Sequence, residues 1–361
     1  MNPMWTARSG GGGHMSGARL GVSYFGVRNP KHVAEDLRSM VEAGCNAVLH
    51  TFSEEDHCFY LETMAEIVAL SKGWGLEVYI DPWGVGGVFG GEAFTRFALE
   101  HDEARQVLAN GKKAPAACPN SEAFQAFMKK WISASVDIGA DVLLWDEPHF
   151  FLPEWYGLPK ELWACRCPHC QELFRQEYGY PLPREPNPDV LDFQDHSLFR
   201  FIQMLTEAAK ARGVKTALCL LPEWESLESL PLKWEKYATL PSLDIFGSDP
   251  YWLWAGRTFA EYERVVRVVK ALADRFGKEP QIWVQACKVR TGDEEQVRRS
   301  VETAYALGVR NIMAWSFLGT AYMSWVRSDQ PEKVWAELTR AFRAIREEEE
   351  RCRTFGSAGA G

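Results

Sequence analysis

The sequence contains no long basic run and no long apolar run. Its formal net charge is −9, so it offers no positively charged face of the kind that binds nucleic-acid phosphates. No apolar stretch approaches about 18 residues, the length that favours a membrane-spanning helix. Residues 1–17 are polar and glycine-rich, without the apolar core of a signal peptide. We therefore expect a cytoplasmic protein with neither a nucleic-acid nor a membrane partner, and a disordered leader or tag over residues 1–17.

A glycine-rich phosphate loop is also absent after the first predicted strand. The chain there reads Ser23-Tyr24-Phe25-Gly26-Val27 and not G-x-G-x-x-G, which argues against a doubly wound dinucleotide-binding sheet. Instead, short apolar runs alternate with amphipathic helical segments. The predicted strands cover residues 20–25, 47–51, 77–80, 141–145, 214–221, 243–246, 281–286 and 311–315.

Eight apolar strands, each followed by a helix, are typical of a closed parallel barrel. Hydrophobic residues make up 46% of the chain, which is enough for a large buried core. We predict an α/β protein with one (β/α)8 TIM barrel over residues 18–350. A long insertion follows the fourth strand, at about residues 150–195, and residues 351–361 are predicted to form a flexible tail.

Polar residues gather at the ends of the predicted strands. In a barrel of this kind, active-site groups project from the C-terminal ends of the strands. Carboxylates there, without a Ser–His pair, favour cleavage of a glycosidic bond, which needs a proton donor and a second carboxylate. The candidates are Tyr24, His50, Asp81, Asp146, Glu147, His149, Glu223, Asp249, Tyr251 and Gln285.

Tryptophan is the unusually abundant residue, with 15 in the chain. Many follow predicted strands, where their flat rings are suited to stacking against sugar rings. We therefore predict a carbohydrate substrate. The tryptophans at strand ends are Trp83, Trp145, Trp224, Trp252, Trp254 and Trp315.

The nine cysteines are an odd number in a chain without an export signal, which favours reduced thiols over a disulfide framework. Three of them, Cys165, Cys167 and Cys170, form a C-x-C-x2-C cluster in the long insertion. Three thiols within six residues favour zinc. His169 lies in the same cluster and is an alternative ligand, although the spacing favours the cysteines.

The fourth predicted strand resembles a family signature. Trp145-Asp146-Glu147-Pro148 is similar to the strand-four motif of the clan A glycoside hydrolases, in which an Asn-Glu pair carries the general acid/base. The resemblance implies that Glu147 is the acid/base. Asp146 departs from the Asn that binds the sugar 2-hydroxyl in that clan.

The cysteines extend the resemblance. The C-x-C-x2-C cluster, with Cys118 ahead of it in a Cys-Pro-Asn segment, is similar to the zinc site of the family 42 bacterial β-galactosidases. The resemblance implies one zinc ion bound by Cys118, Cys165, Cys167 and Cys170. Four thiolates form a closed structural site, which would hold the strand-four loop beside the sugar site.

The seventh predicted strand departs from the clan pattern, because it ends in Gln285 where the clan has a nucleophilic Glu. Three alternatives follow. In the first, Asp249, or in second place Glu223, serves as nucleophile or as base for water. In the second, the Asp146–Glu147 pair acts with substrate participation, as in N-acetylhexosaminidases. In the third, the protein is a non-catalytic carbohydrate-binding barrel.

A metal-dependent sugar isomerase or lyase is a rival from another class, with His50, Asp81 and His149 as the candidate ligands. Among these readings we favour a glycoside hydrolase acting on a small glycoside or oligosaccharide. Its sugar, its anomer and whether it forms a homo-oligomer are left open by the sequence.

Overall fold

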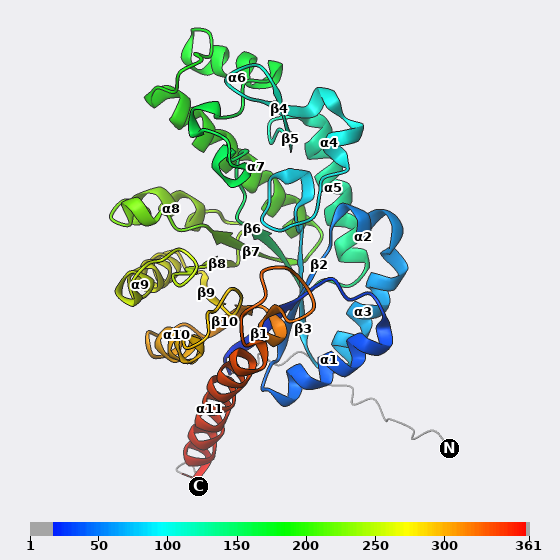
Figure 1. Ribbon diagram of the computed structural model, residues 1–361, viewed down its shortest axis with the longest axis vertical. Helices are drawn as coiled ribbons and strands as arrows, with labels where there is room; N and C mark the ends of the chain where they lie inside the picture. The colour runs from blue at the N-terminus through cyan, green and yellow to red at the C-terminus, as the bar shows by residue number, and fades with distance from the viewer. Residues whose placement is uncertain (1–16, 359–361) are drawn as a thin grey trace.

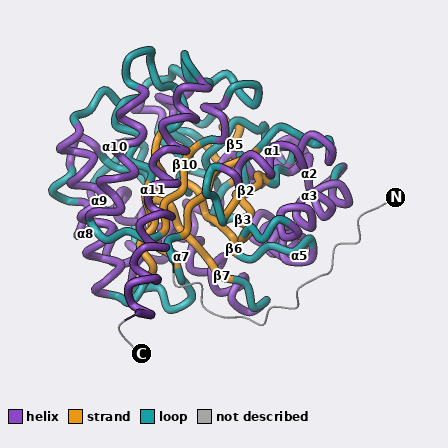
Figure 2. Tube along the Cα trace, turned by 90° about the horizontal axis from the view of Figure 1, so that it is seen from below, coloured by secondary structure: helices purple, strands orange, loops and turns teal. Residues whose placement is uncertain are grey.

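The computed structural model describes residues 17–358. Residues 1–16, which make up nearly all of the predicted leader, lie outside the described residues, as do residues 359–361. Eight parallel strands close into a barrel with the order β1-β10-β9-β8-β7-β6-β3-β2, and helices surround it (Figures 1 and 2). The predicted TIM barrel is therefore confirmed.

Each barrel strand coincides with one of the predicted apolar runs. Their bounds are β1 (Arg19–Tyr24), β2 (Ala47–Thr51), β3 (Glu77–Asp81), β6 (Val142–Asp146), β7 (Lys215–Leu220), β8 (Ile245–Ser248), β9 (Glu279–Gln285) and β10 (Asn311–Trp315).

Alternate residues of these strands face opposite sides of the barrel wall. Leu49, Leu144 and Met313 belong to a small core cluster that fills the barrel interior. Their neighbours in sequence, such as Val48 and Leu143, belong to the larger core between the strands and the outer helices. This alternation decides which residues at a strand end can reach the barrel mouth.

The outer helices follow the strands along the chain. Their bounds are α1 (Pro30–Glu42), α2 (Glu54–Phe59), α3 (Leu61–Gly73), α4 (Phe97–Glu100), α5 (Glu122–Asp137), α6 (Pro168–Tyr178), α7 (Pro188–Ala211), α8 (Leu230–Ala238), α9 (Phe259–Arg275), α10 (Glu294–Ala306) and α11 (Pro331–Ala358). Among the described helices, none combines the length and the apolar character that a membrane crossing requires.

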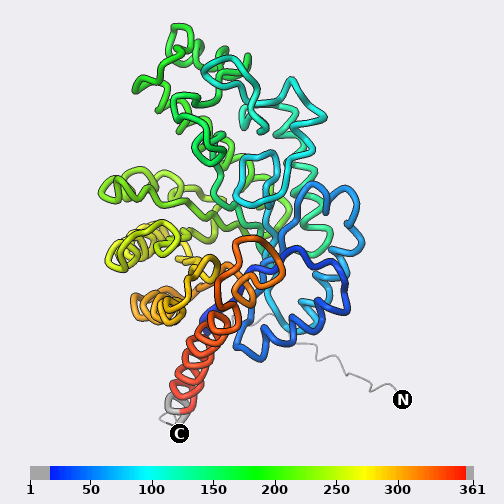
Figure 3. The backbone as a smooth tube through the Cα atoms, in the orientation of Figure 1, coloured from blue at the N-terminus to red at the C-terminus, as the bar shows by residue number. Residues whose placement is uncertain are grey.

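Two features differ from the predicted boundaries. An antiparallel hairpin of β4 (Arg105–Val107) and β5 (Lys113–Ala117) lies between β3 and β6; its strands are too short to give a clear alternating pattern. The final helix α11 continues to Ala358, past the predicted start of the tail at residue 351. The hairpin packs with α6 and the start of α7 around a second apolar core, so segments far apart in sequence lie together (Figure 3).

Candidate active site

A cavity of about 680 Å³ opens at the C-terminal ends of the barrel strands. Its lining combines acidic and aromatic side chains from several strand-following loops. The lining residues that bear on its chemistry are Phe25, Trp83, Glu92, Asp146, Glu147, Trp155, Tyr156, Trp224, Asp249, Tyr251, Trp254, Trp315 and Trp325.

Strand alternation brings the acids to this cavity. Leu144 faces the barrel interior and Trp145 faces outward, so Asp146 faces inward again at the end of β6. Glu147 follows with a φ of 42°, a left-handed conformation that is uncommon outside glycine. A Cβ atom at Gly90 would lie 2.6 Å from Asp146 Oδ2 and 3.1 Å from Glu147 Oε2. Only glycine therefore lets the backbone approach both carboxyl groups.

Glu147 and Asp249 are neighbouring carboxyl groups whose charges interact. Asp249 follows β8, and its pKa is raised well above the usual range, first by burial and then by the nearby Glu147 carboxyl group. One of its carboxyl oxygens, Oδ1, has no hydrogen-bond partner among the described residues. Burial and the charge of Glu147 also raise the pKa of Asp146. Because like charges cannot both ionise freely in a buried site, Asp146 and Asp249 retain protons at pH values where exposed carboxyl groups are ionised.

Asp81 is the fourth acid of the cluster. It ends β3 and is fully buried, and neither of its carboxyl oxygens has a hydrogen-bond partner among the described residues. Burial, followed by the charges of Asp146 and Glu147, raises the pKa of Asp81 well above its usual range. Such a cluster destabilises the fold and is typical of functional sites.

We predict that Asp81→Asn stabilises the protein at pH 8. The folded state holds the Asp81 proton more tightly than the unfolded chain, so wild-type stability falls as the pH rises from the usual Asp pKa towards the raised one. The variant lacks this loss and should gain about 1–3 kcal/mol of unfolding free energy. Urea denaturation at pH 8 and at about pH 3.5, where both proteins carry a neutral side chain, measures the difference. Equal unfolding free energies at pH 8 would contradict the prediction.

Aromatic rings form the walls above the acids. Phe25 stacks on Trp315 with ring centroids 5.1 Å apart and contacts Trp83 at 5.3 Å. Trp155 is 51% exposed and Trp325 is 68% exposed, and Lys288 Nζ covers one face of the Trp325 ring, 3.7 Å from its centre. The contacting rings of Phe25, Trp83 and Trp315 form an aromatic surface of the kind that binds the C–H faces of sugars.

Several of the wall residues were not among the predicted site residues. Trp155 and Tyr156 lie in a short 3₁₀ turn inside the long insertion, and Trp325 lies in the loop after β10. No strand precedes these residues directly, so a search for residues that follow predicted strands did not identify them. Phe25 directly follows β1 and has the inward parity of Ser23; counting alternation along that strand would have found it.

Two predicted residues face the outer helices instead of the barrel mouth. The Tyr24 hydroxyl donates to Asp36 Oδ2 at 2.6 Å, on α1. His50 Nε2 lies 2.8 Å from the Ser71 hydroxyl, on α3, and burial lowers the pKa of His50 to about 4. Both are one position away from the inward parity of their strands, and they adjoin a separate recess described below.

Other predicted residues also lie apart from the acid cluster. Glu223 is exposed and pairs with Lys233, and His149 packs beneath Trp155 with ring centroids 4.8 Å apart. Trp252 Nε1 donates to the Ser300 hydroxyl at 3.3 Å. Each of these side chains is engaged by a neighbouring helix or loop.

Gln285 and Trp145 have structural contacts. Gln285 Oε1 accepts from the backbone N–H of Trp254 at 3.0 Å, and its amide nitrogen donates to the Cys287 carbonyl at 2.9 Å. Gln285 therefore fixes the loop that carries Trp254. Trp145 packs outward against Trp131 and Phe89 and belongs to the core.

The four predicted cysteine ligands converge into one buried cluster. Their sulfur atoms all lie within 4.8 Å of one another, with Cys118 3.4 Å from Cys170 and 3.6 Å from Cys167. A tetrahedral zinc with Zn–S bonds of about 2.3 Å separates its sulfurs by about 3.8 Å, so the spacing fits a metal such as zinc. Cys118 follows β5, and Cys167 caps α6, so the cluster joins the hairpin to the insertion.

No protein-family model matches the chain, and no curated protein sequence matches it either. Solved structures share its fold at low identity. An endo-1,4-β-mannanase from Rhizomucor miehei has 9% identity and a TM-score of 0.59, over 91% of this chain and 95% of its own. A putative α-L-fucosidase from Bacteroides thetaiotaomicron has 9% identity and a TM-score of 0.56, over 92% and 96%. A D-allulose 3-epimerase from a Methylomonas species has 11% identity and a TM-score of 0.51, over 92% and 98%.

Proposed function

We propose that this protein is a glycoside hydrolase that cleaves an O-glycosidic bond with Glu147 as general acid/base and Asp249 as the second carboxylate. The observation that carries the proposal is that Glu147 and Asp249 both line one aromatic-walled cavity at the barrel mouth, where their carboxyl groups interact. The mannanase and fucosidase with the same fold are consistent with it.

A retaining reaction is the proposed first case. Retaining carboxyl pairs are about 5–5.5 Å apart and inverting pairs about 6.5–9.5 Å, and the anomer of the first product distinguishes the two. In the first step Glu147 donates its proton to the leaving oxygen while an Asp249 oxygen attacks the anomeric carbon. In the second step Glu147 removes a proton from water, whose oxygen displaces Asp249 from that carbon.

The raised pKa of Asp249 means that this group holds a proton readily in the free protein. The proposed reaction needs Asp249 as a carboxylate and a proton on Glu147, so substrate binding must supply the free energy that moves the proton from Asp249 to Glu147.

Asp146 supports a second candidate reaction. Its carboxyl group lies beside that of Glu147 against Gly90, the arrangement that a substrate-assisted N-acetylhexosaminidase needs. In that reaction Glu147 is again the acid, while Asp146 orients a 2-acetamido group that attacks the anomeric carbon. Asp249 would then have no covalent role.

The ligand geometry gives less support to a metal-dependent isomerase or to the D-allulose 3-epimerase activity of the third neighbour. Of the side chains proposed for such a site, His50 binds Ser71 and His149 contacts the Glu147 carbonyl. Within residues 17–358, the cysteine cluster is the one group of three or more potential ligands whose atoms converge. We propose that those four cysteines bind a structural zinc, as in the family 42 β-galactosidases that the sequence resembles.

A panel of aryl glycosides that includes N-acetylhexosaminides tests the proposed function. We expect release of the aryl group from at least one glycoside, and proton NMR of the first sugar product should show the anomer of the substrate. Turnover restricted to N-acetylated sugars would favour the substrate-assisted reaction. A first product of inverted configuration would exclude Asp249 as a nucleophile, and no turnover of any glycoside would favour a binding protein.

Substitutions of Asp249 and Gln285 distinguish the candidate second carboxylates. We predict that Asp249→Asn abolishes turnover, because an amide neither attacks the anomeric carbon nor stabilises its positive charge. Gln285→Glu should not raise activity, because Glu lacks the N–H that Gln285 donates to the Cys287 carbonyl. Initial rates on the best aryl glycoside measure both effects. Full activity in Asp249→Asn would contradict the assignment.

A further inference from the structure

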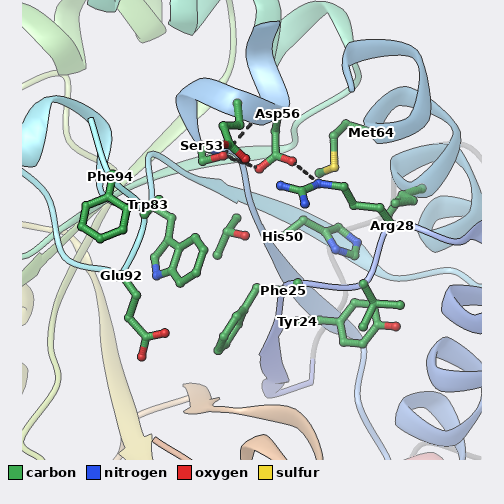
Figure 4. A pocket seen from close by; sticks show the side chains of 16 residues that line it. Tyr24, Phe25, Arg28, His50, Ser53, Asp56, Met64, Trp83, Glu92 and Phe94 are labelled. Carbon is green, nitrogen blue, oxygen red and sulfur yellow. Dashed lines mark hydrogen bonds and ion pairs between the residues drawn. The ribbon is translucent and has the colours of Figure 1, made fainter. Parts of the chain in front are cut away.

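A second recess of about 320 Å³ lies beside the main cavity, between the loop after β1 and helix α2. We name it the Arg28 pocket. Figure 4 shows Trp83 and Phe94 on one side of it and Arg28 and His50 on the other. Neither the predicted catalytic residues nor the cysteine cluster lie in it, so the proposed reaction does not account for it.

The two cavities share one wall. Phe25, Trp83 and Glu92 line both of them, and the contact of Phe25 with Trp315 continues this wall into the main cavity. Trp83 has little freedom to move, because a Cβ atom at Gly91 would lie 1.8 Å from its Cδ1 atom. The shared wall therefore presents a fixed aromatic surface between the main cavity and the Arg28 pocket.

Arg28 is held in position on the far side of the pocket. Its Nε donates to Asp56 Oδ1 at 2.7 Å, and its guanidinium carbon lies 4.5 Å from the centre of the Tyr60 ring. Asp56 is itself buried and accepts from the backbone N–H and the hydroxyl of Ser53, at 3.0 and 2.7 Å. The ion pair with Asp56 thus orients the guanidinium group at little further entropic cost on binding.

The terminal nitrogens of Arg28 remain available to a ligand. They have no hydrogen-bond partner within the described part of the chain, and they point into the pocket (Figure 4). The carboxylates of Glu55 and Glu92 also line this pocket. One cation, several carboxylates and an aromatic wall together suit a neutral polyhydroxylated ring, which offers donors, acceptors and an apolar C–H face. They are poorly suited to an anion, because the carboxylates would repel it.

We propose that the Arg28 pocket is a sugar-binding subsite of the main cavity, and that the substrate is an oligosaccharide whose chain passes over Trp83. This inference rests on the proposed function and narrows its substrate from a small glycoside or an oligosaccharide to the latter. Phe94 is 93% exposed at the pocket and adds a further ring for stacking.

Kinetics on short and long substrates test the subsite. The short substrate is the best aryl monosaccharide glycoside, and the long ones are the disaccharide to tetrasaccharide of the same sugar. We expect Phe94→Ala and Arg28→Ala to lower kcat/KM for the tetrasaccharide by about tenfold, the loss of one stacking or charged hydrogen-bond contact. Activity on the monosaccharide glycoside, which does not reach the pocket, should stay within about twofold.

Two controls separate a subsite from a folding effect. Phe94 is 93% exposed and makes no ring contact within the described residues, so Phe94→Ala should leave the fold intact. This holds even if Arg28→Ala destabilises the fold by leaving the buried Asp56 carboxylate without its ion-pair partner. Arg38→Ala removes an exposed arginine of α1 whose one ion pair among the described residues is with Glu42, at 3.8 Å. This variant should keep the wild-type kcat/KM for both the short and the long substrates. Equal losses of kcat/KM on short and long substrates in Phe94→Ala and Arg28→Ala, or no loss on either substrate, would overturn the proposal of a subsite.

Binding measurements test whether the Arg28 pocket is a sugar-binding subsite even if the protein hydrolyses no glycoside. Calorimetric titration of wild type with mannotetraose, cellotetraose and chitotetraose would then replace the kinetics. An affinity that falls by about tenfold in both Phe94→Ala and Arg28→Ala would support the subsite while the proposed hydrolysis fails. Binding of none of the three sugars, or unchanged affinity in the variants, would overturn it.

Discussion

Replacing Glu147 with Gln is expected to lower kcat/KM for natural glycosides by about 10²–10⁴-fold, the usual contribution of a positioned general acid. The loss should be much smaller with an activated aryl leaving group, because such a group departs without a proton. Gln keeps the shape of Glu, so the close approach of Gly90 is preserved and the effect is chemical. Steady-state rates on an alkyl glycoside and a dinitrophenyl glycoside of the same sugar measure it.

Glu223→Gln is the matched control. It makes the same chemical change in an exposed acid that pairs with Lys233 and does not line the cavity, so its kcat/KM should equal that of wild type. A similar loss for both leaving groups in Glu147→Gln would show that Glu147 is not the proton donor. A loss of kcat/KM in Glu223→Gln comparable to that in Glu147→Gln would instead favour Glu223 over Asp249 as the second carboxylate.

Replacing Cys167 with Ser is expected to remove the metal and lower the melting temperature strongly. A structural zinc contributes its binding free energy, on the order of 10 kcal/mol at neutral pH, to folding. The cluster joins the hairpin β4–β5 to helix α6, and its sulfur atoms are already spaced for one tetrahedral ion. Elemental analysis of the purified protein should give about one zinc per chain for wild type and much less for the variant.

Cys352→Ser is the control, because Cys352 is exposed and lies outside the cluster. It should keep both the zinc content and the melting temperature of wild type. A wild-type protein without zinc, or a Cys167→Ser variant that melts with wild type, would show that the four thiols are a buried cluster without a structural metal.

Zinc removal should also affect the main cavity. The segment between β6 and Cys165 carries Trp155 and Tyr156, which line the cavity, and it is anchored at one end by the strand and at the other by the cluster. At a temperature where circular dichroism shows that the chelated protein is still folded, chelation should therefore raise KM through loss of this wall more than it lowers kcat. A fall in kcat alone would contradict a purely structural role.

The sequence by itself determined the barrel and the position of its acids. Eight apolar runs bury both faces of each strand, and the helical segments between them leave a parallel closed sheet as the compatible arrangement. Asp81, Asp146 and Asp249 follow such runs with the inward parity, and so they reach the barrel mouth together. The spacing of Cys165, Cys167 and Cys170 likewise predicted a cluster of thiols, and the family resemblance added Cys118; the four sulfurs converge with a spacing that fits a metal such as zinc.

Only the tertiary structure decided which other strand-end residues face the mouth and which loops complete it. Tyr24 and His50 are polar and follow strands, but a residue shifted by one position points to the opposite side of the wall; they bind α1 and α3 instead. Trp155 and Trp325 reach the cavity through long loops, whose path depends on packing against distant segments and not on local pattern. Glu147 follows β6 and Asp249 follows β8, and the two line one cavity only because the barrel has closed.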